Sequence, residues 1–171
     1  MLNKLLVVVL VLFLGKSFAQ DTTKTYIDKD SGQHELIGLC TRDAFKDTSY
    51  SWWWDSEYDI YSVDSTSADS LKNKLDDYKI EVIMGTWCSD SKMQVPKLFK
   101  VLDYINFPSD SVKIICVTRD LKTDGNELDS LDIKKVPTII LYKNGEEKGR
   151  IVESPEVSLE KDMLKIVSKG T

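Results

Sequence analysis

The stretch IEVIMGTWCSDSKM, residues 80–93, decides how the fold of this chain is interpreted. Its first residues are mostly apolar and stop at Gly85, a pattern typical of a short strand that is buried on both faces of a sheet. From Ser89 onward apolar side chains recur at helical spacing, and Pro96 inside this run predicts a kink in the helix. The chain therefore passes from a buried strand through a short turn into a helix, and Cys88 stands at the start of that helix.

The position of Cys88 points to a chemical role for its thiol. A cysteine at a helix start faces unpaired backbone N–H groups and the positive end of the helix dipole. Both stabilise the thiolate, which is the nucleophilic form. The alternative is a purely structural cysteine, but such a residue fits better on an apolar helix face or inside a strand. Cys116 is of that kind, because it lies in the apolar run 114–117, and we expect it to be an inert core residue.

The segments on either side of residues 80–93 complete an α/β pattern. Asn144-Gly145 predicts a hairpin between two late strands, and Asp124-Gly125-Asn126 is turn chemistry as well. We interpret the order of elements from residue 67 as α-β-α-β-α-β-β-α, which a mixed sheet covered by helices on both faces satisfies. The hydrophobic periodicity places strands at 80–84, 112–117, 138–142 and 149–152, and helices at 67–78, 89–104 and 157–167.

Four features follow one another along this part of the chain. Trp87-Cys88-Ser89-Asp90-Ser91 comes after the first buried strand, and Pro96 lies eight residues beyond the cysteine. Val136-Pro137-Thr138 leads into the third strand, and residues 142–146 form the hairpin. Over residues 67–168 this combination resembles the thioredoxin family, with a Cys-x-x-Ser variant of its active site.

The resemblance implies a thioredoxin-like mixed β-sheet flanked by helices, preceded by an N-terminal extension. It also implies that Cys88 and Ser91 form the catalytic pair and that Trp87, Val136 and Pro137 bind the substrate. In such a site Pro137 is cis and lies beside Cys88, and the backbone of Val136 pairs with a substrate chain.

Three positions depart from the usual site. Ser91 stands where the family has its resolving cysteine, and a serine can hydrogen-bond to a thiolate but cannot form a disulfide. Val82 stands where many thioredoxins carry a buried acid, so that proton relay is absent. Asp90 beside the thiol should oppose its ionisation, although a carboxylate suits a helix start, and Lys92 could offset the charge. We therefore treat Asp90 and Lys92 as residues that tune the site, with helix capping as the alternative role of Asp90.

Residues 1–19 have the pattern of a secretory signal peptide. Lys4 precedes an unbroken apolar run at 5–14, and residues 17–19 (Ser-Phe-Ala) fit the small-x-small cleavage pattern ahead of Gln20. The run is shorter than the roughly 20 residues that span a bilayer, so we expect cleavage rather than an uncleaved anchor. The mature protein would then start at Gln20, be periplasmic or secreted, and have no stable insertion in the membrane.

Residues 20–66 lie outside the thioredoxin-like domain, which we place at 67–171. The polar start, 20–34, is interpreted as a flexible lead-in. The part that follows is rich in aromatic residues and helical or mixed in pattern, and Trp52-Trp53-Trp54 is its most unusual feature. This triplet either forms a lid that packs on the main core or marks a peptide-binding surface.

Charge and composition limit the partners. The chain has 23 Lys and Arg against 28 Asp and Glu, and an acidic surface argues against nucleic acid or an anionic membrane as a partner. Its three cysteines are too few for a disulfide-stapled scaffold. His34 is the only histidine and lies in the polar lead-in, so we expect no cofactor, no metal site and no Cys-His pair.

These observations leave two functions open. In the first, Cys88 attacks protein disulfides and forms mixed disulfides, which leads to thiol–disulfide exchange, isomerisation or thiol capture. Cys40 is then a candidate resolving thiol, unless it simply packs beneath the extension, between Leu39 and Phe45. In the second, the chain is a redox-inactive binding module that holds a partner with the edge at Val136 and the aromatic extension. The sequence does not indicate the oligomeric state.

Overall fold

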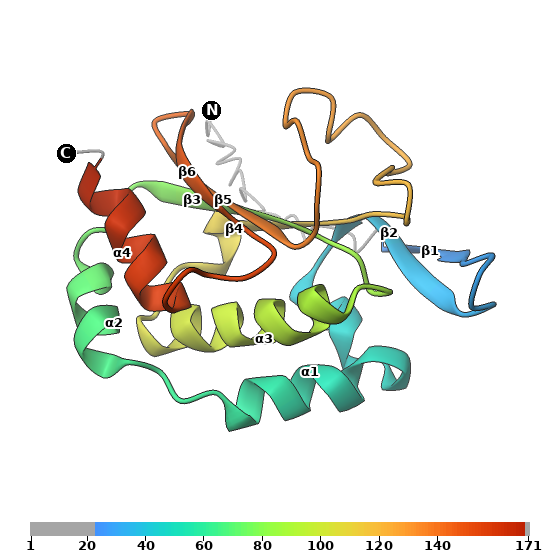
Figure 1. The fold of residues 1–171 in the computed structure, drawn as a ribbon, viewed down its shortest axis with the longest axis horizontal. Helices are drawn as coiled ribbons and strands as arrows, with labels where there is room; N and C mark the ends of the chain where they lie inside the picture. The colour runs from blue at the N-terminus through green and yellow to red at the C-terminus, as the bar shows by residue number, and fades with distance from the viewer. Residues whose placement is uncertain (1–22, 170–171) are drawn as a thin grey trace, which may run out of the picture.

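The computed structural model describes residues 23–169, so the expected signal peptide and the start at Gln20 lie outside this range. Within it, the chain forms both strands and helices, which Figure 1 shows in their order. The strands are β1 (Lys24–Ile27), β2 (His34–Cys40), β3 (Tyr78–Met84), β4 (Val112–Cys116), β5 (Thr138–Lys143) and β6 (Glu146–Val152). The α-helices are α1 (Thr48–Ile60), α2 (Ser65–Lys72), α3 (Ser89–Tyr104) and α4 (Leu159–Lys169), and two short 3-10 helices are η1 (Arg42–Lys46) and η2 (Ser109–Ser111).

The strands of the described range form one mixed sheet with the order β1-β2-β4-β3-β5-β6. β3 and β4 run parallel, and every other neighbouring pair is antiparallel. The parallel pair needs a long crossover, which α3 supplies, whereas β1–β2 and β5–β6 are hairpins joined by short turns. The expected α/β class, a mixed sheet flanked by helices, is confirmed.

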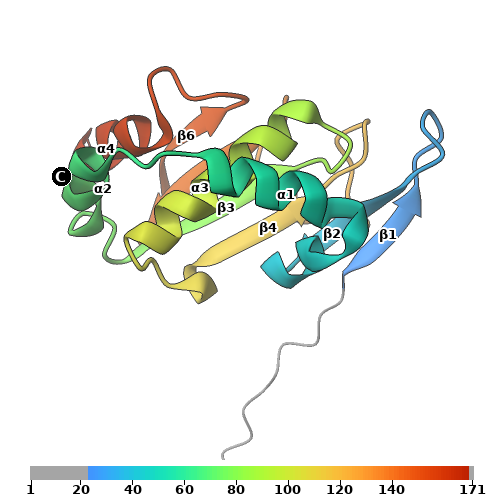
Figure 2. The same cartoon turned by 90° about the horizontal axis from the view of Figure 1, so that it is seen from below.

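All four α-helices pack on the same face of the sheet (Figure 1; Figure 2). Their buried side chains form one main core with the inward-facing residues of the strands, among them Val82 and Met84. The opposite face carries a smaller cluster, which Ile83, Ile115 and Ile140 build together with residues of the segment 118–137. Across residues 23–169, no helix combines the length and the apolar character that crossing a membrane requires.

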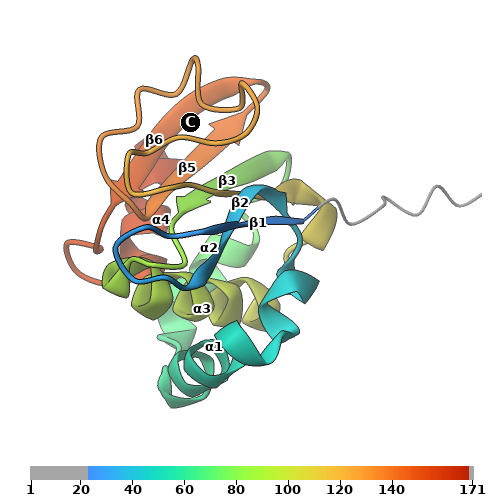
Figure 3. The same ribbon diagram turned by 90° about the vertical axis from the view of Figure 1, so that its right-hand side faces the viewer.

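The segment 118–137 corrects two expectations, a helix between β4 and β5 and helices on both faces of the sheet. It forms a series of turns instead, and Figure 3 shows it above the sheet, opposite the helices. Leu121 and Asp132 have positive φ angles of 55° and 47°, a left-handed conformation that a right-handed helix does not contain. Leu131 of this segment is buried against the sheet. The segment thus covers the second face directly, in the place of a helix.

Residues 24–40 form a β-hairpin, where the polar composition predicts a flexible lead-in over 20–34. β2 is anchored because Leu36 and Cys40 are buried in the main core and because the strand pairs with β4. β1 is an edge strand whose side chains are mostly exposed, which explains its polar composition. The expectation is wrong here because backbone pairing with a distant strand, rather than local apolar content, orders the hairpin.

Helix α1 closes the main core by packing along α3. Trp53 and Trp54 are each 5% exposed, and the Trp54 ring stacks on Phe45 with a centroid distance of 4.4 Å. The same Trp54 ring lies 5.3 Å from the ring of Phe99 in α3. Trp52 points outward and is 68% exposed. Two of the three tryptophans therefore act as a lid on the core, and one remains at the surface.

Candidate active site

The turn between β3 and α3 presents Cys88. Its backbone N–H donates to the carbonyl oxygen of Gly85 at 3.0 Å, which closes the turn. Cys88 is the N-cap of α3, with an extended backbone, and its carbonyl oxygen accepts a hydrogen bond from the N–H of Lys92 at 3.0 Å. The half-buried thiol therefore lies at the positive end of the α3 dipole, as expected for a reactive cysteine.

Val136 faces this thiol from the end of the segment 118–137. Cys88 Sγ donates to the carbonyl oxygen of Val136 at 3.4 Å, and the Val136–Pro137 peptide bond is cis. Trp87 is half-buried next to Cys88, and its indole N–H donates to the carbonyl oxygen of Val117 at 2.8 Å. The structure therefore places Cys88, Trp87 and the Val136–Pro137 bond, four of the five residues proposed for catalysis and substrate binding, together near the end of β3.

Ser91 lies in the first turn of α3 and is fully buried. Its Oγ accepts a hydrogen bond from the backbone N–H of Gly85 at 3.2 Å. The hydroxyl thus holds the backbone of the turn beneath Cys88. Asp90 is half-buried in the first turn of α3, where the helix dipole favours a carboxylate, and Lys92 is half-buried two positions later.

Cys40 and Cys116 lie away from Cys88, in the main core. β2 pairs with β4 so that the two cysteines are close neighbours, and both are buried. The Cys40 thiol donates to the carbonyl oxygen of Gly38 at 3.5 Å. Burial and the adjacent Cys40 thiol raise the pKa of Cys116 well above its usual value. All three thiols are free, and the structure brings Cys40 to Cys116, whereas Cys88 packs against the cluster on the other face.

The sequence reasoning missed two residues that hold the turn, Thr86 and Glu35. The Thr86 hydroxyl donates to the Glu35 carboxylate of β2 and accepts from the backbone N–H of Leu36 at 3.1 Å. Thr86 is 1% exposed and Glu35 is 3% exposed. Glu35 directly follows the stretch 20–34 interpreted as a lead-in, and no local pattern links it to a residue 51 positions away.

Arg119 covers Trp87, and it too was missed. Its guanidinium carbon lies 5.0 Å from the centre of the Trp87 ring, a cation–π distance. Its Nε donates to Oδ2 of Asp28 at 2.7 Å. The backbone N–H of Ser31, together with Arg119, holds the pKa of Asp28 below its usual range. The only signal in the sequence is the position of Arg119 shortly after a buried strand, which is too general to identify it.

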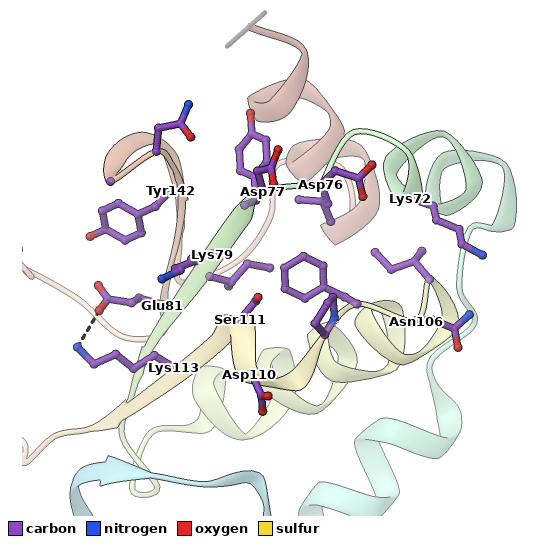
Figure 4. A pocket seen from close by; sticks show the side chains of 18 of the residues that line it. Lys72, Asp76, Asp77, Lys79, Glu81, Asn106, Asp110, Ser111, Lys113 and Tyr142 are labelled. Carbon is purple, nitrogen blue, oxygen red and sulfur yellow. Dashed lines mark hydrogen bonds and ion pairs between the residues drawn. The ribbon is translucent and has the colours of Figure 1, made fainter. Parts of the chain in front are cut away.

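A large hollow of about 1530 Å³ lies at the start of β3 and β4, at the other end of the strands from Cys88 (Figure 4). Glu81 and Lys113 form an ion pair of 2.8 Å on its wall, and Tyr142 stands on the same side. Burial and the Glu81 carboxylate raise the pKa of Tyr142 to about 12. The hollow contains no cysteine, so we place the chemistry at the turn rather than here.

Comparison with solved structures finds several similar chains. A protein of unknown function from Pseudomonas aeruginosa superposes with a TM-score of 0.57 at 15% identity, covering 79% of this chain and 95% of that chain. Thioredoxin O2 from Arabidopsis thaliana gives a TM-score of 0.40 at 20% identity, covering 59% of this chain and 86% of that chain. The described residues form a mixed α/β fold, a six-stranded mixed sheet flanked by helices. No protein-family model matches the chain, and no curated protein is similar in sequence. The similarity to solved structures concerns the fold, and the residues around Cys88 are what indicate a function.

Proposed function

We propose that this protein is an exported monothiol thioredoxin-like protein that engages disulfides or thiols through Cys88. One observation carries the proposal. Cys88 is the half-buried N-cap of α3, with its sulfur 3.4 Å from the Val136 carbonyl, whereas Cys40 and Cys116 are buried in the main core. Among the three thiols, Cys88 thus combines access to solvent with a position that stabilises the thiolate.

The proposed step is thiol–disulfide exchange. The Cys88 proton passes to solvent, and the thiolate attacks one sulfur of a substrate disulfide. A new S–S bond forms between Cys88 and that sulfur while the substrate S–S bond breaks, and the released thiolate takes up a proton. Because Ser91 cannot form a disulfide, release of the substrate requires a thiol of the substrate itself or an external thiol. This requirement favours isomerisation or thiol capture over net reduction.

The residues around the thiol support a protein substrate. The backbone at Val136 lies beside Cys88, in a position for an extended chain to pair with it, and the half-buried Trp87 precedes Cys88 in the turn. The partners we propose are therefore exposed protein thiols and disulfides in the compartment to which the chain is exported.

The proposal is tested with the mature protein and two variants, Cys88→Ser and Cys40→Ala. After incubation with oxidised glutathione, the wild type and Cys40→Ala should carry one glutathione on residue 88, seen by intact mass and peptide mapping. Cys88→Ser should carry none and should lose the ability to reshuffle a protein with scrambled disulfides. Full activity of Cys88→Ser would contradict the proposal and would favour the redox-inactive binding module.

Export is a separate part of the proposal and is supported by residues 1–19. Intact-mass measurement of the protein recovered from the periplasm or the medium should show a chain that begins at Gln20. A recovered protein that retains Met1 to Ala19 would contradict cleavage at this site.

A further inference from the structure

We infer that Glu35, from the N-terminal hairpin, is a positioning residue for Cys88 and acts through the hydroxyl of Thr86. The inference rests on the proposed function, because it concerns how the reactive thiol is held. It assigns to the β1–β2 hairpin, which lies outside the thioredoxin-like domain expected from the sequence, a part in forming the site.

Thr86 connects the hairpin to the turn that carries Cys88. Its hydroxyl is used twice, since it donates to the Glu35 carboxylate and accepts from the Leu36 N–H at 3.1 Å. The turn spans residues 85–88, so Thr86 lies two positions from the nucleophile. Its burial leaves no solvent to replace these partners if they are removed.

Glu35 is a buried carboxylate with a specific partner. A carboxylate at 3% exposure is costly unless hydrogen bonds compensate it, and an apolar residue would pack in β2 at lower cost. Across the hairpin it pairs with Tyr26, whose buried hydroxyl has no hydrogen-bond partner among the described residues. Burial, then the carboxylates of Asp28 and Glu35, raise the pKa of Tyr26 to about 12. The hydrogen bond to Thr86 explains why an acidic residue stands at this buried position.

The hairpin also reaches the next residue of the turn. Asp28 binds Arg119 at 2.7 Å, and the guanidinium of Arg119 covers the ring of Trp87. Asp28 itself is fixed, because its Oδ1 accepts from the backbone N–H groups of Asp30 and Ser31 at 2.8 and 2.9 Å. Two independent contacts, one to Thr86 and one towards Trp87, therefore join the hairpin to the turn.

Each residue of the turn makes its own hydrogen bond to the surrounding structure, and Glu35 accepts the one from Thr86. Ser91 binds the N–H of Gly85, and Val117 accepts from the indole of Trp87. Loss of the Glu35 carboxylate would leave the O–H donor of Thr86 without its acceptor, with only the Leu36 N–H still bound to the hydroxyl oxygen, and the turn would relax. The sulfur of Cys88 would then shift from its place at the N-terminus of α3 and beside the Val136 carbonyl, where the helix dipole favours the thiolate.

The test measures the second-order rate at which Cys88 reacts with the small disulfide dithiodipyridine, in Cys40→Ala background protein that is folded. We expect Glu35→Ala and Thr86→Val each to react about tenfold more slowly, the effect of losing one buried hydrogen bond. Glu35→Gln keeps an acceptor and Thr86→Ser keeps the hydroxyl, so both should stay within about twofold of the wild type. The control Glu81→Ala removes a carboxylate from the middle of β3, where it pairs with Lys113 and does not contact the turn, and it should not change the rate.

A double variant shows whether Glu35 works through Thr86. Because both substitutions break the same bond, Glu35→Ala/Thr86→Val should react no more slowly than the slower single variant. Loss of hydrogen-exchange protection should be confined to the turn, with the urea midpoint showing that the variants remain folded.

Three results would overturn the inference: an unchanged rate in folded Glu35→Ala, a rate for Glu35→Gln as low as that of Glu35→Ala, or strictly additive effects in the double variant. If Glu35→Ala does not fold, the pair Thr86→Val and Thr86→Ser decides alone. The proposed function is judged separately, by comparing wild-type Cys88 with the same thiol in the urea-unfolded chain. A folded thiol that reacts no faster than the unfolded one would contradict the function whatever the variants do.

Discussion

At the scale of single residues, three thiols of one chain meet different surroundings. Cys88 begins a helix at a half-buried position, whereas Cys116 is fully buried in β4 and Cys40 lies next to it in β2. Burial and the Cys40 thiol raise the pKa of Cys116, so its thiolate forms only at a pH above the usual range. Solvent access therefore places Cys88 first in reactivity, and burial together with the raised pKa places Cys116 last.

We expect iodoacetamide to label Cys88 first and Cys116 last in the folded protein at pH 8. The rates should differ by more than about a hundredfold, since a buried thiol reacts only after local opening. Timed alkylation with peptide mapping measures the order, and labelling in urea, where the three rates should converge, is the control. Labelling of Cys116 ahead of Cys88 would show that the assignment is wrong.

Ser91→Cys should convert the monothiol site into a dithiol site. Residue 91 is buried one helical turn from Cys88, with Oγ directed at Gly85 in the same turn. A thiol at this position can attack the mixed disulfide at Cys88, and we expect insulin reduction by dithiothreitol to be about tenfold faster than with the wild type. The control is Ser89→Cys, which adds an exposed thiol beside Cys88. An unchanged rate, with both thiols shown to react, would count against a thioredoxin-like geometry at the site.

At the scale of elements, α1 is the part of the N-terminal extension that seals the main core. Its aromatic residues meet Phe45 of η1 on one side and Phe99 of α3 on the other. Several residues of α1 have little helix propensity, so the stability of this helix depends on its tertiary packing against η1 and α3. Trp52 and Trp54 lie two positions apart in the same helix, and they differ because the Trp54 ring is buried in the core whereas the Trp52 ring is exposed.

Trp54→Ala should lower the free energy of unfolding by about 3–5 kcal/mol, the usual cost of deleting a buried aromatic side chain. Trp52→Ala is the matched control, since its ring is 68% exposed, and it should change stability by less than about 0.5 kcal/mol. Urea unfolding followed by circular dichroism compares the two. Equal losses in both variants would mean that Trp52 is covered in solution, for instance by a bound peptide or a second copy.

At the scale of the whole molecule, several buried acids of high pKa set the response to alkaline pH. Burial, with nearby carboxylates, raises the pKa of both Tyr26 and Tyr50 to about 12, and Cys116 is shifted in the same direction. In the unfolded chain cysteine titrates near pH 8.5 and tyrosine near pH 10. Between those values and about pH 12 the unfolded state has released protons that the native state still holds.

The free energy of unfolding should therefore fall as the pH rises above about 8.5, because stability declines wherever the native state binds more protons. Urea unfolding at intervals from pH 7 to pH 11 measures the slope. Tyr50→Phe removes one of these groups and should make the decline shallower above pH 10. A stability that stays level or increases over this range would contradict the environments described for these side chains.

The turn and the helix after it could be predicted because each signal acts over a few residues. The apolar run ends at Gly85, Cys88 caps the helix, and the periodicity continues to Tyr104, where α3 ends. Asn144-Gly145 is similar, since both residues adopt the positive φ angles, 55° and 81°, that a tight hairpin turn requires. Local chemistry was sufficient in these cases, and the observed elements begin and end close to the expected positions.

By itself the sequence determined the α/β class, the strands of the central sheet and the position of the candidate nucleophile at a helix start. The tertiary structure alone shows that residues 24–40 form a hairpin rather than a lead-in, that 118–137 covers a face without a helix, and that Cys40 lies next to Cys116. It also decided that Glu35 holds Thr86, across 51 positions of sequence. The physical reason is the same for all four: they depend on which distant segments pair and bury one another, and neither periodicity nor turn chemistry carries that information.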